Sequence, residues 1–466
     1  MTLQEQKNLR IKASYLATKE RRKNQVPLTF EFGIRNEKRN RKNGVFEHLN
    51  GCFLNAKWIW NSIVSQTDDK IMGEGKSRKA SSFSQKDFKT VVHKDFEGND
   101  IEDEVLFLSV AQKDAVIDQF KHALAGLNAK KKLGMKVGRI KFKSEFTSLT
   151  LKQYGITHKI CGPNSYQIQG IKTEVRVAGM RQLRNLDKAG IAYEMATAKI
   201  VCIGGDYYIH QTVYVDKDVW NAYKESKHPK ERIKYSINAL DLGCMKTVTD
   251  AYGETYNTQV EEPERLKKLQ RKKNRQMKAA GWNPKAKKKQ RIKCSNNQWK
   301  IRQAIKRQYH KMDCKRNEES IRLCNKILEE TETLVIQDEN LDGWKRTGHG
   351  KKVQHGILGR VKERLQTSEK THVINQWVPT TKLCTHCGEM MEDLTQRDRH
   401  VVCPHCGCDD GERDCHSARI MIWLYSNMKD SIGLDGAEFT REVFDDSLNK
   451  LFHKEIIEGN PEGRKS

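Results

Sequence analysis

Hydrophobic residues follow two different spacings in the first half of the chain. Over residues 45–64 and 105–127 they recur every three or four positions, which predicts two amphipathic helices. Elsewhere short segments alternate apolar and polar residues, which predicts strands separated by Gly and Asn turns. These segments are 28–33, 138–143, 166–168, 174–177, 198–201 and 207–210. We therefore expect a small β-barrel split in sequence, with a helical insertion after its first strand. Residues 66–102 are polar and are expected to form a loop or a poorly packed insertion.

The second half contains apolar strands that end at acidic residues. Residues 236–243 form an apolar run that carries Asp241 near its end, and 247–250 and 254–256 complete a predicted hairpin. The run 333–336 predicts a buried strand that leads to Glu339, and Asp414 opens an apolar helix. Strands and helices of both halves together predict a multidomain α+β protein.

Charge is the strongest feature of the composition. The 466 residues carry a net charge of +26, and the mean hydropathy is −0.80. Such a charge favours a polyanionic partner, although a basic ribosomal or chromatin-like binder has the same composition. Residues 265–316 contain 21 Lys and Arg and a single acid, and this block predicts two basic helices joined by a turn. Residues 1–25 are expected to be a basic arm that becomes ordered on RNA.

Four of the thirteen cysteines have the spacing of a metal site. Cys384 and Cys387 form one Cys-x-x-Cys pair, and Cys403 and Cys406 form a second. Two such pairs predict a closed tetrahedral Zn²⁺ site that stabilises a module too small to have its own core. Cys408 competes with Cys406 as a ligand, but the paired spacing favours Cys406. The sequence has no apolar signal segment and no stretch of eighteen apolar residues, so we expect reduced thiols and a cytoplasmic protein.

Three carboxylates are candidates for a second metal centre. Asp241, Glu339 and Asp414 stand at the ends of apolar strands or at a helix start. Mg²⁺ prefers oxygen ligands, and a pair of Mg²⁺ ions can act on a phosphodiester when carboxylates from separate elements converge. Asp338 is the alternative to Glu339, and its side chain is expected to face the opposite side of the strand. A register with Gln337 at this position would place no charged ligand there.

The order of these motifs resembles the TnpB nucleases of insertion-sequence transposons and their descendants, the miniature type V (V-F-like) CRISPR effectors. The resemblance covers residues 233–428 and rests on the motifs Asp241-Leu-Gly, Glu339-Asn-Leu, the two cysteine pairs and Arg413-Asp-x-x-x-Ala. It implies an RNase H-like RuvC nuclease interrupted by a zinc-finger, target-nucleic-acid-binding module. It also implies a guide RNA, either CRISPR RNA or transposon-derived RNA, and Mg²⁺-dependent cutting of double-stranded DNA beside a short recognised motif.

The sequence patterns and the resemblance together give a domain plan, and the basic residues give a set of expected nucleic-acid contacts. The expected parts are a basic arm (1–25), a wedge-like β-barrel (26–44 and 130–232), a helical recognition insertion (45–129), a RuvC nuclease (233–380) with a basic helical hairpin (261–330), a zinc finger (381–410), the RuvC end (411–430) and a C-terminal tail (431–466). The expected contacts with nucleic acid are Arg139, Lys141, Lys143, Arg271, Lys272, Lys287, Lys288, Arg291, Arg302, Arg360 and Arg413.

Three questions stay open at this point. The RNA could bind one protein copy or a homodimer. An unguided RNase H-like transposase or resolvase would have the same three acids, and a catalytically inactive zinc-ribbon regulator would have the same cysteines. The choice between a CRISPR effector and a transposon nuclease depends on the RNA, which the sequence does not contain.

Overall fold

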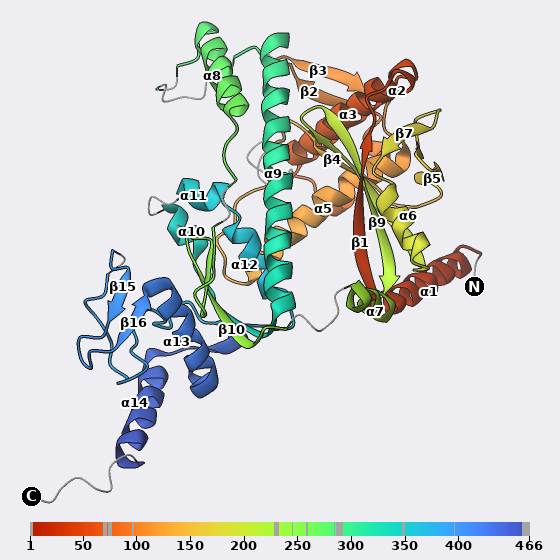
Figure 1. The fold of residues 1–466 in the computed structure, drawn as a ribbon. Helices are drawn as coiled ribbons and strands as arrows, with labels where there is room; N and C mark the ends of the chain where they lie inside the picture. The colour runs from red at the N-terminus through yellow and green to blue at the C-terminus, as the bar shows by residue number, and fades with distance from the viewer. Residues whose placement is uncertain are drawn as a thin grey trace, which may run out of the picture. The chain divides into compact units, whose positions relative to one another are not determined.

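The computed structural model describes residues 3–68, 72, 77–95, 97–227, 233–244, 246–257, 260–283, 285, 292–346, 350–395 and 397–458. The chain forms two compact units. The first unit consists of Met1–Ser226 and Leu269–Arg307, and the second consists of Lys227–Lys268 and Gln308–Ser466 (Figure 1). Both units combine helices with a sheet, as the sequence predicts.

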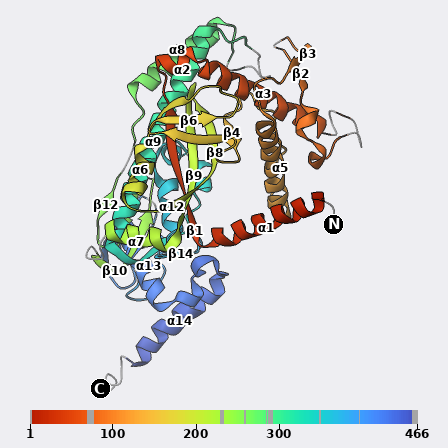
Figure 2. The same cartoon turned by 90° about the vertical axis from the view of Figure 1, so that its right-hand side faces the viewer.

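The first unit contains a seven-stranded, barrel-like sheet that is nearly closed (Figure 2). Its strand order is β4-β8-β9-β1-β7-β6-β5, and all neighbours pair antiparallel. Strand β9 pairs along its length with β1, from Gln25 opposite Asp216 to Gly33 opposite Tyr208, and with β8, from Tyr193 opposite Val215 to Ile203 opposite Asp206. The strands are β1 (Gln25–Ile34), β4 (Ser148–Leu151), β5 (His158–Gly162), β6 (Ser165–Ile168), β7 (Val175–Ala178), β8 (Tyr193–Ile203) and β9 (Asp206–Asp216).

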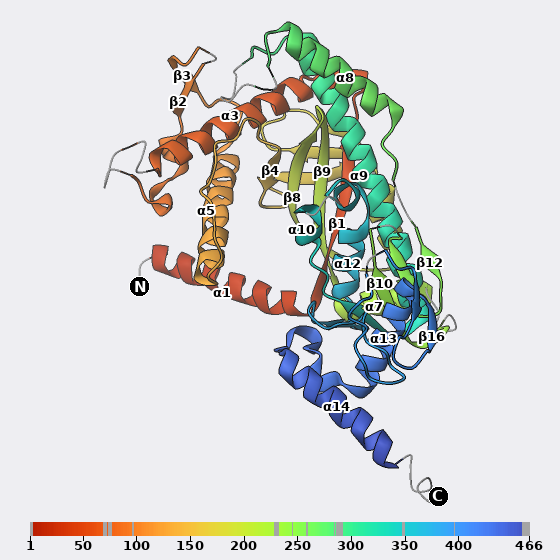
Figure 3. The ribbon, with the colours of Figure 1, turned by 90° about the vertical axis from the view of Figure 1, so that its left-hand side faces the viewer.

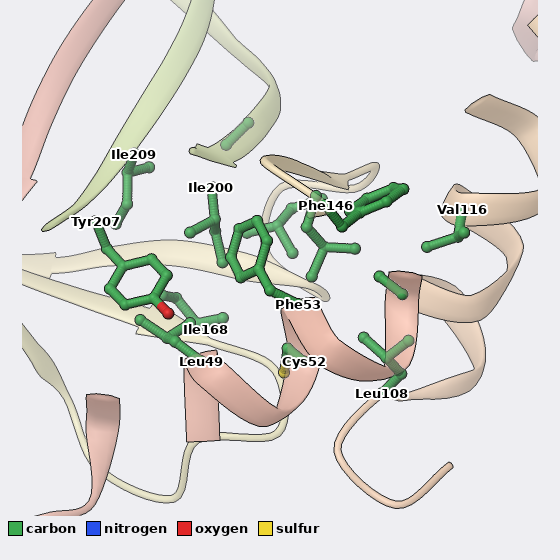
Figure 4. Close-up of a cluster of buried hydrophobic side chains, with 14 of the residues drawn as sticks. Leu49, Cys52, Phe53, Leu108, Val116, Phe146, Ile168, Ile200, Tyr207 and Ile209 are labelled. Atoms are coloured by element: carbon green, nitrogen blue, oxygen red, sulfur yellow. The ribbon is translucent and has the colours of Figure 1, made fainter. Parts of the chain in front are cut away.

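Helices α3 and α5 cover this sheet and share its core. Helix α5 begins with a capping box, in which Ser109 and Gln112 satisfy each other's backbone N–H groups. Both helices lie against β4 (Figure 3). The shared core includes Leu49 and Phe53 of α3 and Ile200 of β8, all buried (Figure 4). The helices of this unit are α1 (Leu3–Lys23), α2 (Lys38–Lys42), α3 (Val45–Gln66), α5 (Val110–Lys132), α6 (Arg181–Lys188) and α7 (Lys217–Lys227).

The segment 138–143, predicted to be a strand, has no regular secondary structure. It is held by side chains of α3 instead of by a neighbouring strand. Trp60 Nε1 donates a hydrogen bond to the carbonyl oxygen of Lys141 at 3.2 Å, and Asn61 bonds both the N–H and the carbonyl of Lys143. An extended chain bound in this way has the same alternation of side chains as a strand, which is why the sequence pattern was misleading.

The expected basic arm forms the helix α1, and Arg22 near its end lies 3.3 Å above the ring of Tyr214 and pairs with Glu194 at 3.0 Å. A further expectation for the first unit was wrong. The polar segment 66–102 includes two 3₁₀ turns, η1 (Ala80–Ser82) and η2 (Gln85–Asp87), and most of a hairpin, β2 (Thr90–Lys94) with β3 (Asp100–Glu104). The sequence also failed to predict β4 and β5.

The second unit contains a five-stranded mixed sheet of order β12-β11-β10-β13-β14. Strands β10, β13 and β14 run parallel, whereas β11 and β12 continue from β10 as an antiparallel hairpin. The strands are β10 (Tyr235–Leu242), β11 (Val248–Asp250), β12 (Thr255–Tyr256), β13 (Thr331–Gln337) and β14 (Thr371–Ile374). The predicted hairpin and the predicted buried strand are therefore confirmed.

Helix α13 (Arg413–Asn427) packs on β10, β11 and β13 of this sheet. The predicted pair of basic helices is confirmed as α8 (Glu264–Ala279) and α9 (Asn296–Glu330), and each contributes residues to both units. The remaining elements are α10 (Leu341–Trp344), α11 (Gly350–His355), α12 (Leu358–Gln366), η5 (Lys429–Ser431), η6 (Leu434–Gly436) and α14 (Arg441–Glu458). Among the helices described here, none has an apolar stretch long enough to cross a membrane.

A small two-stranded module precedes α13. It is formed by β15 (His400–Val402) and β16 (Asp409–Glu412), together with a single bridge between Leu383 and Met390. The core of the module contains Met391 and Val401 beside buried cysteines, whereas Leu383 is buried in the core that includes α13. A core of this size is too small to hold the module together without a further constraint.

Candidate metal centre

The three predicted carboxylates line one pocket of about 570 Å³ in the second unit. Asp241 lies near the end of β10, Glu339 follows the end of β13 by two residues, and Asp414 is the second residue of α13. Because β10 and β13 run parallel, with Leu240 opposite Ile336, their carboxyl ends meet at the same edge of the sheet. The N-terminal end of α13, which packs on β10, brings Asp414 to this edge (Figure 1).

The structure distinguishes Glu339 from its neighbours in sequence. Asp338 faces away from the pocket and lies 2.7 Å from Lys362 Nζ, while its Oδ1 also accepts a hydrogen bond from Gln366. Gln337 is buried, and its Nε2 donates to three backbone carbonyls, including that of Val378 at 2.8 Å. Glu339 alone among the three lines the pocket. Its role as a ligand stays a prediction, but its position fits that role.

The pocket disfavours the ionised forms of Asp241 and Glu339. Burial raises the pKa of Asp241 to about 7, and the charges of Asp414 and Glu339 add to this rise, against Ser417 and Arg413. Burial also raises the pKa of Glu339 to about 7, with Lys362 acting in the opposite direction. A group of acids that repel one another in this way is stabilised when a cation binds between them. The residues therefore fit Mg²⁺, which takes carboxylate oxygens as ligands.

Basic side chains surround the acids. Arg413 and Arg399 lie 3.2 Å and 3.7 Å from Asp414 Oδ1, and Lys246 and Lys382 line the same pocket. Of these four, the sequence had indicated only Arg413. In the sequence, Arg399 lies between the two cysteine pairs, whereas Lys246 lies in the β10–β11 turn. Only the fold brings these two residues to the same pocket, and no sequence motif indicates it.

The four predicted zinc ligands converge in the two-stranded module. Cys384 Sγ lies 3.7 Å from Cys406 Sγ, Cys387 Sγ lies 3.7 Å from Cys403 Sγ, and all four sulfurs lie within 4.8 Å of one another. Zn–S bonds of about 2.3 Å in a tetrahedron separate the sulfurs by about 3.8 Å. The cluster therefore fits Zn²⁺, and this metal would supply the constraint that the small core lacks. Cys408 does not belong to this group of four.

The predicted nucleic-acid contacts in the first unit are only partly free for such a role. Lys141, Arg271, Lys272 and Arg302 are exposed, and Arg139 is exposed with a long ion pair to Asp68 at 3.4 Å. Lys143 instead packs its ammonium group 3.4 Å above the ring of Trp60, and burial lowers its pKa. Lys143 therefore contributes to the fold of this unit.

The remaining predicted contacts lie in different settings. Arg360 is half-buried, and its guanidinium group pairs with Asp313 and donates a hydrogen bond to Asn317. These partners within the second unit already satisfy the guanidinium group. Arg413 lies in the pocket beside Asp414. Lys287, Lys288 and Arg291 lie outside the described residues.

No protein-family model matches the chain, and a search of curated proteins also found no match. Among solved structures, the chain is similar to a Cas12f1–sgRNA–target DNA complex, with 12% identity over 87% of this chain and 99% of that chain and a TM-score of 0.44. It is also similar to CasPhi-2 (Cas12j) bound to crRNA, with 10% identity over 86% of this chain and 98% of that chain and a TM-score of 0.36. A CRISPR-Cas12f ternary complex shows 12% identity, with 82% and 81% of the two chains covered and a TM-score of 0.27.

Proposed function

We propose that the chain is an RNA-guided DNA endonuclease that hydrolyses phosphodiester bonds at Asp241, Glu339 and Asp414. The observation that carries this proposal is the convergence of these three carboxylates, from two parallel strands and one helix, in a single pocket with a basic rim. Such a pocket suits a negatively charged substrate and a pair of divalent cations at the same time.

The architecture of the second unit supports the proposed reaction class. A five-stranded mixed sheet with α13 packed on it, interrupted between β14 and α13 by a Cys₄ module, fits the RNase H-like RuvC nuclease that the sequence motifs imply. The domain plan predicted from sequence remains part of the proposal. In particular, we propose that the segment 381–410 is a zinc module that guides the DNA strand toward the carboxylates.

The residues of the pocket divide into two roles. When bound, two Mg²⁺ ions would supply an activated water and stabilise the attacking and leaving oxygens of the phosphodiester. Asp241, Glu339 and Asp414 would hold these ions. Lys246 and Lys382 also line the pocket wall, where they pair with Glu412 and Glu392, and they would contact the phosphates on either side of the cut by exchanging these partners.

The paired arginines have a further role in the proposed site. Without a cation, Arg399 and Arg413 neutralise Asp414. Once Asp414 binds a cation, their guanidinium groups become available to the phosphate backbone, for which their planar donor set is well suited. This exchange of partners would couple the binding of metal to the binding of DNA.

Guidance by RNA is supported by the family resemblance of the motifs and by the net charge of +26. In this part of the proposal, base pairing reads the target sequence, while the protein reads a short duplex motif and holds the heteroduplex through its backbone. The exposed basic residues of α8 and α9, among them Arg271, Lys272 and Arg302, suit contact with that backbone.

The test is to purify the protein expressed from its native locus and to sequence the RNA that accompanies it. We expect one structured RNA with a variable segment. A repeat-derived end would identify a CRISPR effector, and a transposon-derived end would identify a transposon nuclease. Heterogeneous RNA, or none, would contradict guidance and leave an unguided nuclease at the same carboxylates.

A further inference from the structure

A second group of metal-ligand side chains lies beside the Cys₄ cluster. His386, Cys408 and Asp410 each place one donor atom within 4.8 Å of the other two. His386 Nε2 is 3.9 Å from Asp410 Oδ1, and Cys408 Sγ is 4.0 Å from the same oxygen. None of the three belongs to the Cys₄ cluster, so the two groups share no ligand.

The local fold explains how these residues meet. In both Cys-x-x-Cys turns, the N–H of the following glycine donates to the carbonyl oxygen of the first cysteine at 2.9 Å. His386 lies within the first turn, and Cys408 directly follows the second. Because the four zinc ligands join the two turns, folding of the module brings His386 and Cys408 to the same place. Asp410 reaches them from β16, two residues after Cys408.

The donor set suits a borderline divalent cation. An imidazole nitrogen, a thiolate and a carboxylate oxygen are all common Zn²⁺ ligands, with bonds of about 2.0–2.3 Å. The observed separations require movements of under about 1 Å to reach such bonds. The side chain of His386 is 60% exposed and can make this movement. The carboxylate of Asp410 is less free to move than His386, because its Oδ2 lies 3.2 Å from Nδ1 of the buried His416.

An ordinary ion pair does not explain the group as well. A histidine and a carboxylate 3.9 Å apart, with the histidine exposed, interact only weakly in water. The thiol of Cys408 adds only a long hydrogen bond of 4.0 Å to the same oxygen. A bound cation accounts for all three side chains, and a ligating carboxylate that contacts a buried histidine is a common supporting arrangement around zinc.

We propose that His386, Cys408 and Asp410 form a second Zn²⁺ site, with three protein ligands and one open position. This site is separate from the Cys₄ cluster and does not depend on the nuclease activity proposed above. Bound metal would fix the start of β16, the strand that ends directly before Arg413 and Asp414.

The test is the zinc content of the full-length protein, measured by elemental analysis after dialysis, for the wild type and three single variants. We expect two zinc ions in the wild type, and one in both Cys408→Ser and His386→Ala. His405→Ala is the matched control, because His405 is the equivalent exposed histidine of the second turn and lies outside the group. It should keep both ions.

Substitution with Co²⁺ shows which thiols bind metal. We expect the Cys408→Ser protein to lose the thiolate-to-cobalt absorption of one ligand while the absorption of a four-cysteine site remains. One zinc ion in the wild type would overturn the proposal, as would two in Cys408→Ser. Loss of the four-cysteine absorption in Cys408→Ser, with its retention in Cys406→Ser, would also overturn it, because Cys408 would then be the fourth ligand of the Cys₄ cluster.

Discussion

Replacing Asp241 by Asn should stabilise the metal-free protein at alkaline pH. In the folded protein, burial and the neighbouring acids raise the pKa of Asp241 from 3.8 to about 7. Ionisation is therefore more costly in the folded state than in the unfolded state. The carboxyl group favours folding most at low pH, and this contribution is lost as the pH rises through about 7. Asparagine has nearly the same shape and does not ionise.

The expected gain in the free energy of unfolding follows from the size of the pKa rise of Asp241. At about 1.4 kcal/mol for each pH unit between the two pKa values, the penalty at pH 8 has a ceiling of about 4 kcal/mol. Part of it is repulsion shared with Glu339 and Asp414, so we expect Asp241→Asn to gain about 3 kcal/mol. For a domain of 150–250 residues this gain raises Tm by about 6–12 °C. At pH 5 the gain should fall to about 1 kcal/mol, since folded Asp241 is then protonated.

The assay is thermal unfolding in EDTA at pH 5 and pH 8, followed by the same measurement in Mg²⁺. Mg²⁺ should raise the Tm of the wild type at pH 8 more than that of the variant, because it binds the ionised carboxylates. Asp338→Asn is the matched control, since Asp338 is half exposed and pairs with Lys362, and its effect should stay under about 1 kcal/mol. An Asp241→Asn protein that is no more stable than the wild type at pH 8, or that gains equally at both pH values, would refute the reasoning.

Three further predictions concern the surroundings of the pocket. Gln337→Glu would bury a carboxylate against three carbonyl oxygens, so chemical denaturation at pH 8 should show a loss of about 3 kcal/mol or more, whereas an unchanged midpoint would contradict this packing. Gly388→Ala should lower the free energy of unfolding by about 2–4 kcal/mol, because Gly388 has φ +76° and an added Cβ would lie 2.4 Å from the ring of Phe452. Adding Phe452→Ala should recover the part of this loss that is due to the clash. If nothing is recovered, the whole loss comes from the backbone conformation. Cys384→Ser should lose the Cys₄ zinc and expose 381–412 to limited proteolysis while the first unit stays resistant, and a zinc-free module that resists protease would show that its small core suffices.

The strands that carry the site could be predicted from the sequence because each contains a short, largely apolar run with an acid at or shortly after its end. Residues 236–242 and 333–336 both match strands of the second unit, and the paired cysteines match a cluster of four sulfurs. Each of these features depends on residues close together in the sequence. The convergence of Asp241 and Glu339 was expected from the ligand preference of Mg²⁺ and from the family resemblance, whereas the parallel pairing of β10 and β13 that brings them together is a finding of the structure.

Other features depend on contacts between distant segments and left no local pattern. The alternation at 138–143 is that of a strand, but Trp60 and Asn61 of α3 occupy the hydrogen bonds that a neighbouring strand would take. Of the described side chains of α1, all but Thr18 and Arg22 are exposed, and Arg22 contacts Tyr214 and Glu194. Arg399 likewise reaches Asp414 only because the Cys₄ module folds beside α13. Such pairings arise from the fold and not from the spacing of residues.

The central claim, a nuclease site at three carboxylates, is tested most directly by cleavage of matched duplex DNA by the RNA-bound protein in Mg²⁺. We compare the wild type with Glu339→Gln and Asp338→Asn, which each replace a carboxylate by an uncharged amide at adjacent positions. Of these two residues, only Glu339 lines the pocket. We expect Glu339→Gln to reduce the cleavage rate at least 100-fold while RNA and DNA binding are retained, and Asp338→Asn to cleave within a few-fold of the wild type. Full cleavage by Glu339→Gln, or its loss only in Asp338→Asn, would contradict the account.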